Sequence, residues 1–196
     1  MRLPLGKTLV TLAAAAGLAA ACSTPPDSPD FPVPRYTQAP PIKLDVAEIR
    51  VEQSYEPPLE KPNVEHIVPL RPADAARQWV KDRLQGVGRR GTATVDIVTA
   101  SVTEESLETE GGVGGFLTTE PETRYTAKME LAVDVERPAD SGSARVRGAR
   151  GTGVLEGSSI NAREMVVYDL VKNLMTDIDG QMADTLNGAL GRFVAE

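Results

Sequence analysis

The clearest structural signal in the chain is the stretch YTAKMELAVDV at residues 125–135. Its apolar side chains fall at every second position, namely Tyr125, Ala127, Met129, Leu131, Val133 and Val135. Polar side chains occupy most positions between them, namely Thr126, Lys128, Glu130 and Asp134. A period of two predicts a strand that buries one face and exposes the other, as in an antiparallel sheet.

Further strands are expected on both sides of this one. Residues 138–142 form a turn signal, and residues 144–155 read as the partner strand of a hairpin. Arg145 and Arg147 then share one face, where either can pair with Glu130 or Asp134 across the hairpin. Residues 92–102 predict a preceding strand whose apolar pattern changes face between Ile97 and Val98.

The first strand is expected at residues 42–51. Its apolar positions also change face midway, which indicates either a bulge near Ala47 or burial on both faces. Residues 57–71 follow as a long irregular connection containing the only histidine, His66. We interpret His66 as structural, with a pH sensor or catalytic base as the alternative.

Two helices complete the pattern. The first opens at Pro72, ends near Gly86 and carries Trp79, which we expect to be a core anchor rather than a partner contact. For the second, Asn161 and Glu164 predict a capping box, with Ile160 and Met165 as a hydrophobic staple. An apolar stripe follows, which indicates a core seam more than an oligomer interface, formed by Val167, Leu170, Val171, Leu174, Ile178, Met182, Leu186 and Leu190.

The order of these elements is β–α–β–β–β–α, which predicts an α+β fold. We expect an antiparallel-rich sheet with the two helices packed on one face, in a single domain spanning residues 42–192. The first helix would make the crossover between the first two strands.

The first 21 residues have the three parts of an export signal. Arg2 and Lys7 are positive, residues 8–18 are apolar but too short for a permanent membrane span, and small residues follow. The only cysteine, Cys22, comes directly after them. An ordinary secreted protein cut after Ala21, with an incidental Cys22, is the alternative.

The sequence Leu18-Ala19-Ala20-Ala21-Cys22 resembles the lipobox of bacterial lipoproteins. The family most often has Leu three residues before the cysteine, where this chain has Ala19. The resemblance implies cleavage before Cys22 and acylation of that residue, which would anchor the protein without a membrane-spanning helix. Ser23 in place of aspartate implies sorting to the outer membrane, on the inner leaflet facing the periplasm.

Residues 22–41 are rich in proline, serine and aspartate. Such a segment buries too little apolar surface to fold, so we expect a disordered tether between membrane and domain. A polyproline ligand for a partner is the alternative.

Composition excludes several classes of function. The net charge of −7, without a basic cluster, argues against nucleic-acid binding, and aromatic residues are only 4% of the chain. One cysteine and one histidine exclude a Cys/His zinc site. We therefore expect no metal and no cofactor.

The hairpin tip at residues 103–123 contains six glutamates and no basic residue. We interpret it as a solvated loop that discourages pairing with other chains; the functional alternative is a docking loop with Val113, Phe116 and Leu117 as apolar contacts. The glycines at 111–115 lack the Lys-Ser/Thr of a phosphate loop, and the glutamate spacing is not that of a calcium loop. Ser158-Ser159 is expected to form the turn into the last helix.

Together these features predict a lipid-anchored, non-enzymatic accessory or assembly factor of an envelope complex. The element order and anchor resemble small envelope lipoproteins of the lipopolysaccharide-assembly or transport-auxiliary kind, as topology only. The first alternative is a binder of small apolar ligands such as lipids, and the second is an envelope hydrolase.

Overall fold

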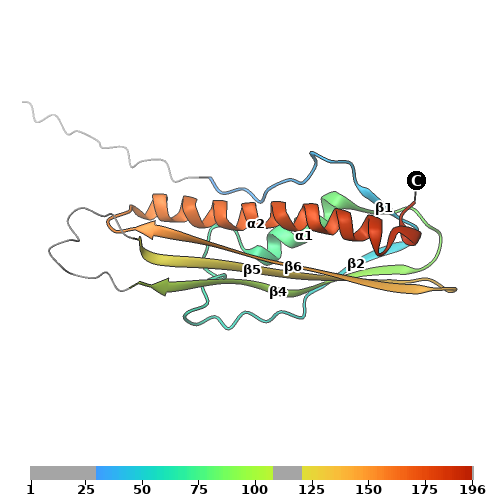
Figure 1. Cartoon of the computed structure of the whole chain (residues 1–196), viewed down its shortest axis with the longest axis horizontal. Helices are drawn as coiled ribbons and strands as arrows, with labels where there is room; N and C mark the ends of the chain where they lie inside the picture. Colours follow the sequence, from blue (N-terminus) through green and yellow to red (C-terminus); the bar gives the residue numbers. More distant parts are fainter. Residues whose placement is uncertain (1–29, 108–120, 196) are drawn as a thin grey trace, which may run out of the picture.

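The computed structural model describes residues 30–107 and 121–195 (Figure 1). The elements in chain order are β1 (Ile42–Leu44), β2 (Glu48–Glu52), α1 (Pro72–Arg83), β3 (Leu84–Gly86), β4 (Thr92–Ser106), β5 (Pro121–Glu136), β6 (Ser141–Leu155), α2 (Ile160–Gly188) and the short 3-10 helix η1 (Gly191–Phe193). The main sheet has the order β2-β4-β5-β6, and β1 pairs with β3 in a small second sheet. The predicted α+β fold is confirmed.

The two helices lie on one face of the main sheet, with the long α2 along the molecule (Figure 1). β4, β5 and β6 are antiparallel neighbours, whereas β2 is parallel to β4. A parallel pair needs a crossover connection, and α1 supplies it, as the sequence predicts.

The expected first strand is in fact two strands. β1 and β2 are separated at residues 45–47, where Val46 N donates to Leu44 O and Ala47 N donates to Gly91 O. The break sends β1 to β3 and β2 to β4, which explains the change of apolar face near Ala47. The short strand β3 had no periodic signal of its own.

The other change of face is a bulge in β4. The register with β5 shifts between Ile97 and Thr99, so Ile97 and Ala100 both point into the core. The apolar residues of β5 named above are all buried. Across the next pair, Arg145 Nη1 lies 2.9 Å from Glu130 Oε1, which confirms one of the expected cross-strand pairs.

Gly148 of β6 has a packing role. A Cβ atom on Gly148 would lie 3.2 Å from Leu174 Cδ1 and 3.3 Å from Ile178 Cδ1, both on α2. The absence of a side chain at this position therefore lets α2 approach the edge strand closely.

The start of α2 differs from the prediction. Ser159 is the N-cap, and its Oγ accepts a hydrogen bond from Ala162 N at 3.2 Å. The capping box of Asn161 and Glu164 is wrong because Asn161 already lies inside the helix. The staple is wrong as well, since Ile160 is 76% exposed and Met165 43% exposed.

The rest of the apolar stripe is confirmed as a core seam. Its members are at most 5% exposed, including Met182 and Leu186 in the second half of the helix. Trp79 is fully buried on α1, as expected of a core anchor, and its Nε1 donates to Asp179 Oδ1 on α2. The core also extends to Phe193, which is fully buried just beyond the expected domain end at residue 192.

Candidate functional site

The predicted site residues Cys22, Val113, Phe116 and Leu117 lie outside the described residues. Of the acidic hairpin tip, the structure describes residues 103–107 and 121–123. Glu104 accepts a hydrogen bond from Tyr125 OH at 3.1 Å and lies 4.0 Å from Lys61 Nζ. Glu104, at the start of the tip, therefore contacts both β5 and the connection at residues 57–71.

Residues 30–41 pack against the helices, so the prediction of a disordered tether over 22–41 is wrong for this part. Tyr36 is only 7% exposed, although the segment is rich in proline. Phe31 contacts the ring of Tyr168 on α2, with the centroids 5.3 Å apart, and Tyr168 OH donates to Pro32 O at 2.8 Å. Composition alone missed this because the anchoring partners lie far away in the sequence.

The strongest attachment of this segment is to α1. Arg35 Nε and Nη2 donate to the Asp82 carboxylate at 2.8–3.1 Å, and Tyr36 N donates to Asp82 Oδ2 at 3.0 Å. Gln78 Nε2 adds another hydrogen bond at 2.9 Å. The Arg35 guanidinium, together with these donors, holds the pKa of Asp82 well below its usual range.

The connection at 57–71 is also attached to the domain. Val64 N donates to Val102 O at 2.8 Å, and Glu104 N donates to Pro62 O at 2.8 Å, so the connection covers the edge of β4 beyond β2. The carboxylate of Glu65, 3% exposed, accepts from Tyr55 OH at 2.8 Å and Val102 N at 3.2 Å. Sequence reasoning did not single out Glu65, because its partners lie in distant strands and loops.

His66 belongs to a cavity on one side of this connection. The cavity measures about 280 Å³ and is lined by Tyr55, Pro57, Leu59, Glu65, His66, Arg71, Pro72, Ala73 and Ala100. The imidazole is half-buried, and its Nδ1 makes no hydrogen bond within the part of the chain that the structure describes.

Ser158 and Ser159 lie in the turn before α2, where Ser158 Oγ donates to Leu155 O.

A second cavity, of about 210 Å³, lies on the other side of the connection. It is lined by Val64, Ile67, Val68, Pro69, Glu104, Tyr125, Ile160, Arg163, Glu164 and Val167. Ile67 and Ile160 at its rim are 70% and 76% exposed. Leu155 and Met165, near the start of α2, are also exposed. We call the group Ile67, Leu155, Ile160 and Met165 the apolar end.

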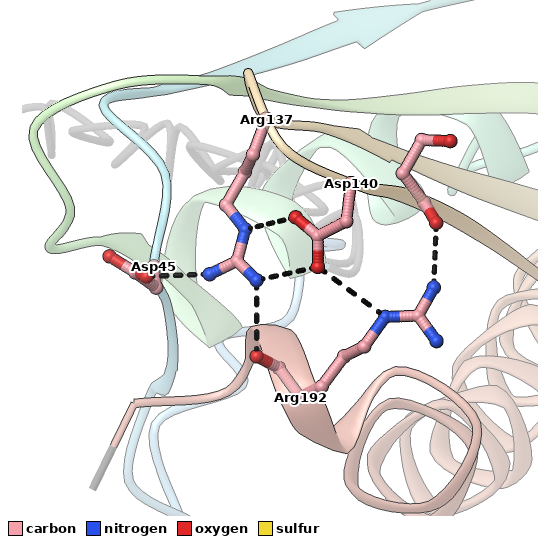
Figure 2. A network of polar contacts seen from close by, with 5 residues as sticks. Asp45, Arg137, Asp140 and Arg192 are labelled. Carbon is pink, nitrogen blue, oxygen red and sulfur yellow. Dashed lines mark hydrogen bonds and ion pairs between the residues drawn. The ribbon is translucent and has the colours of Figure 1, made fainter.

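The opposite end of the sheet carries a network of charged groups (Figure 2). Arg137 binds Asp140 through two hydrogen bonds of 2.9 Å and reaches Asp45 at 2.6 Å, and Arg192 Nε lies 3.6 Å from Asp140. Arg137 and Arg192 also contact the Phe193 ring, 4.6 and 4.7 Å from its centroid. Arg137 holds the pKa of Asp140 below its usual value. The network closes this end of the domain around the C-terminal residues.

The outer face of the sheet is polar. A shallow depression of about 320 Å³ on it is lined by Thr99, Lys128, Met129, Glu130, Arg147, Gly148 and Ala149.

Within residues 30–107 and 121–195, no group of three or more His, Cys, Asp or Glu side chains is placed to hold a metal ion. None of the helices in these ranges is both long enough and apolar enough to span a membrane.

Comparison with known proteins gives neighbours in structure only. No protein-family model matches the sequence, and no curated protein matches it. The chain is similar to a minor lipoprotein from Acinetobacter baumannii, with a TM-score of 0.41 and 9% identity over 78% of this chain and 98% of that chain.

Two further solved structures are similar at a comparable level. The rare lipoprotein B from Shewanella oneidensis gives a TM-score of 0.37 at 13% identity, covering 70% of this chain and 95% of that one. A Xanthomonas campestris protein of family DUF330 gives 0.33 at 12% identity, covering 80% and 97%. Similarity at this level assigns neither a family nor a function to the chain.

Proposed function

We propose that this chain is a lipid-anchored lipoprotein of the bacterial cell envelope. In this proposal Cys22 is acylated, the domain faces the periplasm, and the anchor lies in the inner leaflet of the outer membrane. The protein would act without catalysis, as an accessory or assembly factor of an envelope complex.

The observation that carries the proposal is the position of the only cysteine. Cys22 follows an export signal directly, in the lipobox-like sequence Leu18–Cys22, and eight residues (22–29) precede the first described residue. Acyl chains contribute about 0.8 kcal/mol per buried CH₂, so two or more chains hold a protein stably at a bilayer.

The contacts of residues 30–41 fit an anchored domain. Arg35 and Tyr36 fasten this segment to Asp82, and Phe31 fastens it to Tyr168. The domain would therefore be held close to the lipid by a short link instead of hanging from twenty free residues.

For the partner we propose contact through the hairpin tip, with Val113, Phe116 and Leu117, and through the outer edge of β6. β6 is the last strand of the main sheet, and its fifteen residues pair with β5 alone among the strands described. A long unpaired edge is a template for another strand.

Fractionation of cells that express Cys22→Ser tests the anchor. We expect the wild type to incorporate labelled palmitate and to sediment with outer membranes, whereas Cys22→Ser should lose the label and become soluble. Ser23→Ala is the matched control, and Ser23→Asp should shift the protein to the inner membrane. Palmitate incorporation into Cys22→Ser would contradict the proposal.

Photo-crosslinking in cells tests the partner. A photoreactive residue at Phe116 or at Ala149, which is exposed on β6, should give one dominant protein adduct if the protein is an assembly factor. Adducts with lipid alone from Ala149, on the outer strand of the sheet, would favour the small-ligand alternative instead.

A further inference from the structure

The apolar end is a surface that the core does not use. Ile160 and Ile67 are 76% and 70% exposed, yet they come from different segments and share the rim of one cavity. Ile160, the first residue of α2, and Leu155, the last residue of β6, flank the same turn. Exposed apolar side chains gathered in this way mark a contact surface.

The chain enters the domain near the same end. Phe31 packs on Tyr168, eight residues into α2, which at 1.5 Å per residue is about 12 Å from Ile160 along the helix. The nine residue steps from Cys22 to Phe31 span at most about 32 Å even when fully extended. The anchor point therefore lies within reach of the apolar end.

The opposite end lies at the limit of that reach. From Tyr168 to Gly188, the end of α2, the helix rises about 30 Å. If the charged network of Arg137 and Asp140 stood on the bilayer, the point of entry would be about 30 Å above it, and the link from Cys22 to Phe31, of at most about 32 Å, would have to be fully extended.

We infer that the apolar end rests on the surface of the same bilayer that holds Cys22, with α2 rising from it. This inference rests on the proposed function, because it needs the lipid anchor. The occupant is a neutral or zwitterionic lipid surface. Glu104 and Glu164 line the cavity with one basic residue, Arg163, and Glu156 lies in the turn before α2, so the acidic excess at this end disfavours anionic headgroups. Ile67 and Ile160 are the side chains that would enter the headgroup region.

Fluorescence quenching on vesicles tests the orientation. Full-length acylated protein is reconstituted into phosphatidylcholine vesicles containing phosphatidylcholine with a nitroxide near the headgroup. Acylation leaves no free thiol, so an environment-sensitive fluorophore can be attached to Ile160→Cys alone. Val87→Cys is the matched control, because Val87 is also apolar and 45% exposed. It lies at the opposite end of the domain, where its N–H donates to Leu44 O.

We expect the label at position 160 to be quenched about threefold more than the label at position 87, as for a side chain in the headgroup region. Adding Ile67→Ser should reduce the quenching at 160, whereas Val51→Ser, on the exposed edge strand β2, should not. Equal quenching at both sites, or more at 87, would overturn the inference while leaving the anchor intact. Failure of the acylated protein to float with vesicles would overturn the proposed function as well.

Discussion

Arg83 and Asp179 join the two helices in the interior of the domain. Arg83 Nε lies 2.7 Å from Asp179 Oδ1, which also accepts the Trp79 indole N–H at 2.8 Å. The Arg83 side chain is only 5% exposed. The Asp179 carboxylate and Pro40 O, to which Arg83 Nη1 donates, therefore take the place of water around the buried guanidinium. One acidic residue of α2 thus positions α1, the core tryptophan and the end of the docked N-terminal segment.

Removing this carboxylate should destabilise the domain strongly. Asp179→Ala leaves a buried guanidinium without its counter-ion, and we expect the free energy of unfolding to fall by about 3 kcal/mol. Asp177→Ala, which breaks an exposed pair with Arg150, should cost less than about 1 kcal/mol. Urea denaturation of the soluble Cys22→Ser form measures both. Equal losses would mean that the buried pair has no special role.

Breaking the Arg35–Asp82 contact should release residues 30–41. In Asp82→Asn the charge that holds Arg35 and the Tyr36 N–H is gone. We expect trypsin to cleave after Arg35 at least about tenfold faster, because an opening free energy lowered by 1.4 kcal/mol raises the open population tenfold. Asp74→Asn, which loosens an exposed pair with Arg77, should leave this cleavage rate unchanged.

The same carboxylate predicts a pH dependence. The pKa of Asp82 is lower in the folded state than its ordinary value of 3.8, so the unfolded state binds its proton first as the pH falls. The stability contributed by Asp82 is therefore complete at neutral pH and is lost below about pH 4. The difference in unfolding free energy between wild type and Asp82→Asn should shrink between pH 5 and pH 3. A difference that stays constant over this range, or grows, would show that the carboxylate is not stabilised by folding.

Gly148 should not tolerate a side chain. A Cβ atom there meets Leu174 and Ile178 at 3.2–3.3 Å, so Gly148→Val should lower the unfolding free energy by about 2 kcal/mol through overpacking. At Gly151, also in β6, the nearest atoms are 3.7 Å or more from the Cβ position, and Gly151→Val should be neutral or stabilising. Thermal unfolding of the two variants distinguishes them; a stable Gly148→Val would mean that α2 can move outward.

Phe193 should act as a core residue in spite of its place near the C-terminus. Its ring is fully buried between Arg137 and Arg192, and we expect Phe193→Ala to cost about 3 kcal/mol or more. Arg192→Ala, whose side chain is 58% exposed, should cost less than about 1 kcal/mol. If chemical denaturation gave similar values for both, the ring would not be part of the cooperative unit.

Local sequence patterns were enough to predict β5, β6, α1 and most of α2. The side chains of β5 alternate with a period of two, and the stripe from Val167 to Leu186 follows the helical period, so neighbours within four residues carry the signal. The parity changes marked the right positions: a bulge lies near Val98, and near Ala47, where a bulge or burial on both faces was expected, the strand breaks in two. Ser159 was missed as the N-cap because Asn161 offered an equally good cap two residues later.

The remaining features depend on residues that are distant in the chain. Nothing near Arg35 indicates that Asp82, 47 residues away, will bind it, and the Pro-rich composition of the segment predicts the opposite. The pairing of β1 with β3, the burial of Glu65 and the contact of Arg83 with Asp179 follow the same rule. Local periodicity shows which face of a helix or strand is buried. The partner of a charged side chain or of a strand edge is determined only when packing brings distant segments together and removes the competing water.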